Sequence, residues 1–152
     1  MLAESLAEYS ALMTVEKEFG AEKTRHILRY GFATDADVRA EDVVADAGRT
    51  RFTLRLPECD AIAVNLNLPG RHNVLNALAA AAIGWQLGVA PESIARALEQ
   101  FQGIGRRFNL LGELDFGRGK ALLVDDYGHH PRELQAVFDA ARAGWPQRRL
   151  VI

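Results

Sequence analysis

The stretch "RFTLRLPECDAIAVNLNLPGRHNVLNALAAAAIGWQLG" (Arg51–Gly88) changes its hydrophobic period once, and this change decides the fold class. In residues 51–56 and 61–68 strongly apolar side chains occupy every second position, which is typical of strands with one buried face. The link "PECD" (57–60) between them is short and rich in turn-forming residues. The two runs are therefore predicted to form an antiparallel hairpin.

After "LPG" the same stretch follows a helical period. The expected apolar stripe consists of Leu75, Leu78, Ala79 and Ala82. So much alanine allows close packing against a sheet or another helix, and Gly88 is a natural end for the helix. Pro91 suits the first turn of a second helix. The stripe of that helix consists of Ile94, Leu98 and Phe101.

Two elements are predicted upstream of this stretch. Residues 1–19 have the pattern of a helix that ends at Gly20, and "HILRYGF" (26–32) is expected to be a short strand. The apolar stripe of the first helix consists of Leu2, Leu6, Tyr9 and Met13. Such a stripe should not stay in water, so we expect it to cover apolar surface within the chain or between two self-associating chains.

Downstream, "GIGRRF" (103–108) breaks the helical pattern and is predicted to be a hinge. The runs "FNLLGELDF" (108–116) and "KALLVDD" (120–126) are predicted to be strands, the second one covered on both faces because it is continuously apolar. A helix is expected to begin at Pro131, and a further strand at 148–152. A strand, a helix and a strand in this order predict the opening of a parallel α/β unit. The apolar side of the helix consists of Leu134, Val137, Phe138 and Ala141.

The composition excludes several classes of protein. The 152 residues include 18 Lys and Arg against 20 Asp and Glu, so a net charge of −2 provides no basic field for nucleic acid. No apolar run approaches the roughly 20 residues that span a bilayer, and no signal pattern begins the chain. The single Cys59 fits a reducing cytoplasm, and its expected role is that of a loop or core thiol.

The junction "DDYGHH" (125–130) concentrates ionisable groups between a strand and a helix, where open parallel sheets bind ligands. Three uses compete: a metal site, an acid/base pair, or a loop that grips part of a ligand. An Asp there can accept hydrogen bonds from ribose hydroxyls, or it can simply cap the loop or the next helix. A metal is disfavoured because adjacent His129 and His130 cannot readily face one ion, and one of them can cap the helix instead.

Two further groups of polar residues stand out. Asn73 and Asn76 are three residues apart at a predicted helix start, so they share a face, and amides pair well with base edges. One of them can equally be a helix cap, and nearby His72 is expected to make a structural contact. Arg107 in the hinge is either a solvated charge or a bidentate grip on phosphate.

Three motifs in this order resemble the Mur ligases: "GRHNVLNALAAAA", "ALEQFQGIGRRF" and "LLVDDYGHHPREL". The segment "RYGFATDADVRAEDV", which begins at Arg29, is also similar to the central domain of that family. The resemblance implies an α/β fold: part of a central domain, with an antiparallel β element and helices, followed by the start of a Rossmann-like parallel domain. The implied division is an N-terminal helix of unclear origin at 1–22, the back of the ATPase-type central domain at 23–102, the hinge at 103–108, and the first part of the C-terminal domain at 109–152.

The resemblance implies a cytoplasmic ATP-dependent carboxylate–amine ligase that uses Mg²⁺ and joins L-alanine to UDP-N-acetylmuramate in peptidoglycan precursor synthesis, a step on which cell shape and division depend. Carried over, Asn73 and Asn76 would lie at the adenine, Arg107 would reach the nucleotide phosphates, and Asp126 would hold the ribose. Tyr127 and His129 would lie near the reacting end.

The sequence also departs from the family pattern. It contains no glycine-rich GKT or GKS phosphate loop, no identified Glu and His for magnesium, and no family motif within residues 1–22. We therefore assign no catalytic residue and no metal ligand, and we expect the chain to be inactive alone and to bind no cofactor tightly. The alternatives are a non-catalytic α/β binding or interaction module, or part of the related ligase that recycles murein tripeptide.

Overall fold

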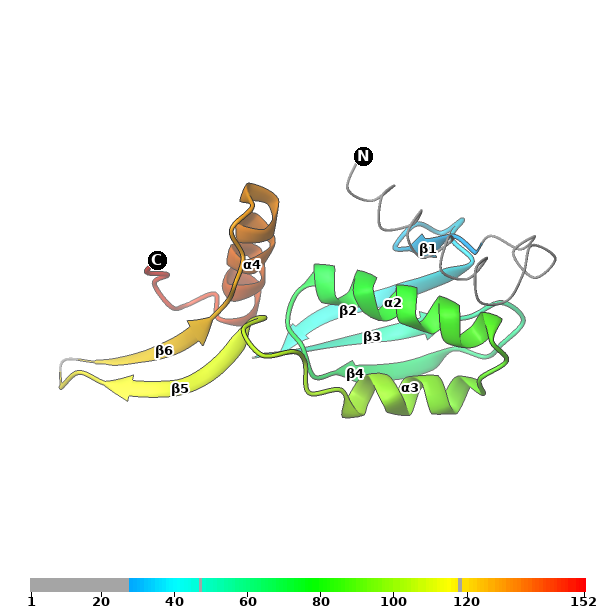
Figure 1. Cartoon of the computed structure of the whole chain (residues 1–152), viewed down its shortest axis with the longest axis horizontal. Helices are drawn as coiled ribbons and strands as arrows, with labels where there is room; N and C mark the ends of the chain where they lie inside the picture. The colour runs from blue at the N-terminus through cyan, green and yellow to red at the C-terminus, as the bar shows by residue number, and fades with distance from the viewer. Residues whose placement is uncertain (1–27, 47, 118) are drawn as a thin grey trace.

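The computed structural model describes residues 28–46, 48–117 and 119–152. The predicted helix at 1–19 and the first two residues of the predicted strand at 26–32 lie outside these ranges. The described chain has a larger half and a smaller half (Figure 1). We call residues 28–102 the sheet half and residues 109–152 the hairpin half. The elements are β1 (Tyr30–Gly31), β2 (Val38–Asp46), β3 (Arg49–Arg55), β4 (Ile62–Leu66), α2 (Arg71–Gln86), α3 (Pro91–Gln100), β5 (Asn109–Asp115), β6 (Lys120–Asp125) and α4 (Pro131–Gly144).

The sheet half contains a four-stranded sheet in the order β1-β2-β3-β4. The predicted hairpin is confirmed: β3 and β4 pair antiparallel, with Phe52 opposite Val64. Strand β1 pairs parallel with β2, and β2 pairs antiparallel with β3. Strand β2 was not predicted from the sequence, because a shift of register between Glu41 and Val44 interrupts the alternation of its side chains.

Helices α2 and α3 are confirmed and share one core with the sheet. Their predicted stripes are only partly correct. Leu78 and Ala82 are buried, but Leu75 and Ala79 are only half-buried, because the helix turns Val74, Ala77 and Ala81 toward the core. A helix with so many alanines has little contrast between its faces, so its sequence does not choose one stripe. Ile94 is buried, but Phe101 is 45% exposed because α3 ends at Gln100 and the chain leaves in an extended conformation.

The hairpin half consists of the antiparallel pair β5–β6 followed by α4, which begins at Pro131 as predicted. Ala140 is the buried residue of α4, and its four predicted apolar positions are half-buried. The expectation that β6 is covered on both faces is wrong, since Leu123 is 45% exposed. A two-stranded sheet with one following helix provides no second layer among the described residues.

The strand expected at 148–152 is not formed, so β6 and α4 lack the parallel partner that the pattern predicts. The chain turns there instead: the Arg148 N–H donates to the Trp145 carbonyl at 3.0 Å, and the Arg148 guanidinium pairs with Glu113 of β5. These contacts replace the ladder hydrogen bonds that a parallel strand would need. The predicted α/β class is nevertheless confirmed.

No helix in the described ranges is long and apolar enough to cross a membrane.

Candidate functional site

The carboxylate of Asp126 joins the loop after β6 to the end of the hinge by a hydrogen bond. Its Oδ2 accepts the Phe108 N–H at 2.8 Å, and its Oδ1 accepts the Gly128 N–H at 2.6 Å. The loop-capping role that the sequence left open for this residue is therefore real. Two oxygens offer about four acceptor positions, and two hydrogen bonds leave room for a further donor such as a hydroxyl.

Asp125 takes a different set of partners from its neighbour. Its Oδ2 lies 3.5 Å from the Nε of Arg106, whose guanidinium lies 5.0 Å from the centre of the Tyr127 ring. Tyr127 in turn donates its N–H to the Arg106 carbonyl at 2.9 Å. Successive residues of a strand point to opposite sides, so the two acids have separate tasks.

The two histidines of the loop also differ in role. His130 is the N-cap of α4, where its Nδ1 accepts the Arg132 N–H at 3.3 Å, so capping by a histidine is confirmed. His129 is exposed, and its ring meets the Tyr127 ring edge-on with 5.5 Å between centroids. Within the described residues, no group of three or more His, Cys, Asp or Glu side chains is arranged to hold a metal.

Glu133 completes the cap of α4. Its Oε2 accepts the backbone N–H groups of His130 and His129, each at 3.3 Å. The His130 N–H, followed by the His129 N–H, holds the pKa of Glu133 below its usual value because both hydrogen bonds favour the carboxylate. Glu133 was not singled out in the sequence, although its place two residues after Pro131 is typical of a capping box.

The predicted amide pair lies at the start of α2. The Nδ2 of Asn73 donates to the Pro69 carbonyl at 2.7 Å, so this side chain secures the preceding turn and does not cap the helix. Asn76 is exposed and forms no hydrogen bond through its side chain within the described ranges. The two amides remain one helical turn apart, as the spacing requires.

His72 links these groups across the two halves. Burial lowers the pKa of His72; the negative charge of Asp126 opposes this effect, and the positive charge of Arg107 adds to it. The first turn of α2, the hinge and the loop after β6 are therefore close enough for their charges to interact. Arg107 is exposed, and its guanidinium has no ion-pair partner in the described part of the chain. Asp126 and Arg107 therefore lie near His72 at the start of α2. Tyr127 and His129 are exposed.

The two halves meet closely at Gly70, the N-cap of α2. Figure 1 shows α4 beside the first turn of α2. A Cβ atom on Gly70 would lie 2.8 Å from the Cβ of Ala140, which is buried, and 2.8 Å from Cε1 of His72. Gly70 also has φ +94°, a conformation that other residues rarely adopt. A glycine is therefore required here for two independent reasons.

We expect His72→Gln to reduce the loss of stability that acid causes in the wild type. The unfolded chain binds a proton at His72 more readily than the folded chain, so stability falls as pH drops below about 6.5 toward the lowered pKa. Thermal unfolding at about pH 7.5 and pH 5.5 measures this difference. His129→Gln, at an exposed position, is the control. An identical acid-induced loss in wild type and His72→Gln would contradict this assignment.

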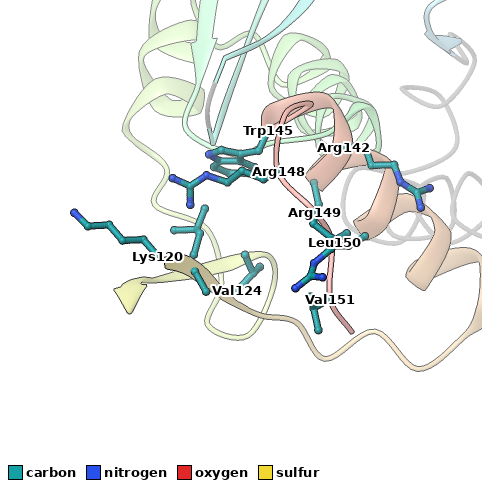
Figure 2. Close-up of a pocket in the computed structure, with 11 residues that line it drawn as sticks. Lys120, Val124, Arg142, Trp145, Arg148, Arg149, Leu150 and Val151 are labelled. Atoms are coloured by element: carbon teal, nitrogen blue, oxygen red, sulfur yellow. The ribbon is translucent and has the colours of Figure 1, made fainter. Parts of the chain in front are cut away.

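A separate groove of about 480 Å³ lies between β6, the end of α4 and the last residues of the chain (Figure 2). Lys120, Arg142, Arg148 and Arg149 surround a lining of apolar side chains. None of the site residues expected from the sequence lines this groove.

Comparison with known proteins gives a matching family, related sequences and related structures. Residues 7–84 match the Mur ligase middle domain. The expectation that residues 1–22 do not resemble this family is therefore wrong for residues 7–22. The chain is 70% identical over 129 residues to the UDP-N-acetylmuramate–L-alanine ligase of Xanthomonas campestris pv. campestris (strain B100). This alignment covers 84% of the chain and 27% of the relative. The chain therefore spans about a quarter of the length of the curated relatives it matches.

Two solved structures have the same fold. The UDP-N-acetylmuramate-alanine ligase MurC of Thermotoga maritima aligns with a TM-score of 0.67 and 28% identity, over 79% of this chain and 27% of that one. MurF of Acinetobacter baumannii aligns with a TM-score of 0.63 and 31% identity, over 78% of this chain and 26% of that one. The family match covers more than half of the 152 residues and agrees with both structures, so the chain belongs to the Mur ligase family.

Proposed function

We propose that this chain supplies one wall of the nucleotide site of a cytoplasmic ATP-dependent ligase that joins L-alanine to UDP-N-acetylmuramate in peptidoglycan precursor synthesis. The observation that carries the proposal is the Asp126 carboxylate, which is half-buried at the junction and is held by the Phe108 and Gly128 N–H groups. The 70% identity to a relative of that name supports the choice of substrates.

Each residue has a defined part in this proposal. The free acceptor positions of Asp126 receive ribose hydroxyls, while its bonds to Phe108 and Gly128 keep the carboxylate fixed. The exposed guanidinium of Arg107 binds phosphate oxygens, a task that suits its planar, permanently charged group. Asn73 and Asn76 present their amides toward the base, and Tyr127 and His129 face the acceptor substrate.

ATP, when bound, supplies the phosphoryl group that activates the carboxylate of the acceptor. The junction fits a nucleotide, because the fixed Asp126 carboxylate is bonded to the end of the hinge that carries the exposed guanidinium of Arg107. Magnesium does not fit these residues equally well, because the described part of the chain offers no cluster of carboxylate ligands. We therefore assign no step to a metal.

Titration of adenosine and of ATP, followed by NMR, tests the proposal on the chain itself. We expect dissociation constants of about 1 mM or weaker, equivalent to roughly −4 kcal/mol, since one charged hydrogen-bond acceptor must offset the cost of ordering the ligand. Asp126→Asn is expected to abolish the chemical-shift changes that the ligands cause, because the Asn side chain has only one oxygen that can accept hydrogen bonds. Asp125→Asn is the matched control, because Asp125 faces Arg106, and it is expected to leave them.

If Asp125→Asn abolishes the shifts and Asp126→Asn leaves them, the assignment of the two acids is wrong.

The second candidate function is an interaction module, and the exposed apolar residues of the hairpin half favour it: Leu111 is 56% and Phe116 is 68% exposed. Self-association without nucleotide-dependent shifts would support that candidate. Activation of a murein tripeptide by the complete enzyme, with no activation of UDP-N-acetylmuramate, would instead support the recycling ligase.

A further inference from the structure

The hinge loop holds two residues in an unusual backbone conformation. Arg106 has φ +61° and Phe108 has φ +47°, which are left-handed values that residues other than glycine rarely adopt. Phe108 is nevertheless only 4% exposed, so its ring is held in one place. A strained conformation persists only where surrounding contacts impose it.

Trp145, the residue directly after α4, makes the contact that holds Phe108. The two rings stack with 6.1 Å between centroids and 7° between planes. The same indole lies beside the turn between β2 and β3, where a Cβ on Gly48 would be 3.7 Å from its Cη2 atom and 3.8 Å from its Cζ2 atom. Trp145 therefore stacks on the hinge residue Phe108 and lies close to Gly48 of the sheet half.

The backbone of Phe108 carries this contact to the site, since its N–H is the donor that fixes Oδ2 of Asp126 at 2.8 Å. The Gly128 N–H fixes Oδ1 of the same carboxylate from within the loop itself. The Asp126 carboxylate therefore has two different donors. The position of the Phe108 N–H depends on the tertiary structure, whereas the position of the Gly128 N–H depends on the loop that also carries Asp126.

We propose that Trp145 is a positioning residue for Asp126 and acts through Phe108. By stacking on the Phe108 ring it keeps the hinge in its left-handed conformation, and this conformation directs the Phe108 N–H at the carboxylate. The positioning does not depend on any ligand. Its consequence for nucleotide binding rests on the proposed function.

The test follows two backbone amides of the full chain by NMR in Trp145→Ala. We expect the Phe108 amide to lose its hydrogen-bonded chemical shift and to exchange with solvent about tenfold faster or more, as local opening predicts. The Gly128 amide is expected to keep both properties, because its bond to Asp126 spans only two residues. A general loss of structure would change both amides, so the pair distinguishes positioning from unfolding.

Trp145→Phe keeps an aromatic ring and is expected to restore the Phe108 amide at least in part. Trp85→Phe is the matched control, because Trp85 packs against the core of the sheet half and should not affect either amide. An unchanged Phe108 amide in Trp145→Ala would overturn the proposal, as would equal changes in both amides of Trp145→Phe. Adenosine affinity is measured on the same samples. If the wild type does not bind adenosine, the proposed function is contradicted, whereas the Phe108 and Gly128 amides still test whether Trp145 positions Asp126.

Discussion

Replacing Gly70 by alanine is expected to destabilise the contact between the two halves more than any other single change at the junction. The new Cβ would lie 2.8 Å from the Cβ of Ala140, an atom that cannot swing aside, so α4 must move away from α2. The backbone at φ +94° adds strain of about 1–3 kcal/mol, and overpacking adds a similar amount. The expected loss is therefore about 2–6 kcal/mol.

Urea denaturation measures this loss, and limited proteolysis shows where the chain opens. The first cut in Gly70→Ala should fall within residues 103–108, since these residues connect the halves. The matched control is Gly88→Ala: Gly88 also has a left-handed φ of +77°, but a Cβ there would meet no atom within 4 Å. Equal losses in the two variants would show that backbone strain alone matters and that the Ala140 contact does not.

The second large effect is expected for Leu78→Ala, with a loss of about 3–5 kcal/mol in the free energy of unfolding. Leu78 is fully buried in the middle of α2, where the helix packs on the sheet. Removal of its side chain leaves a cavity that neighbouring groups of a β-sheet and an α-helix cannot fill completely. Because α2 also carries His72 and Asn73, the loss should loosen the candidate site.

Leu111→Ala provides the comparison for the same chemical change at an exposed position. Leu111 is 56% exposed on β5, so its truncation is expected to change stability by about 0.5 kcal/mol or less. Both variants are measured by urea denaturation under the same conditions. A loss at Leu111 as large as that at Leu78 would mean that the exposed face of the hairpin half is covered in solution.

Much of the secondary structure followed from local patterns. The hairpin of β3 and β4, the helices α2 and α3 and the start of α4 at Pro131 all follow from side-chain period, turn residues and proline. Each of these signals depends on a few neighbouring residues, so it does not require knowledge of the tertiary structure. Strand β2 escaped detection because its bulge breaks the period that reveals strands.

Several residues of the candidate site could be predicted from the sequence, but the contacts between them could not. The loop 125–130 and the amides of Asn73 and Asn76 are visible in the sequence, because polar side chains crowd a strand end and a helix start. The Phe108 N–H holds Asp126, which lies 18 positions away in the sequence. The Phe108 ring stacks on Trp145, which lies 37 positions away. No local pattern encodes a pairing over such distances.

The sequence by itself determined the family and the order of most elements, because each depends on motifs or on periods within short segments. Only the tertiary structure decided which stripe of α2 is buried, which groups hold the Asp126 carboxylate, and that Gly70 must accommodate Ala140. The physical reason is the same in each case: burial and close contact are properties of two surfaces, and one segment of sequence specifies only one of them.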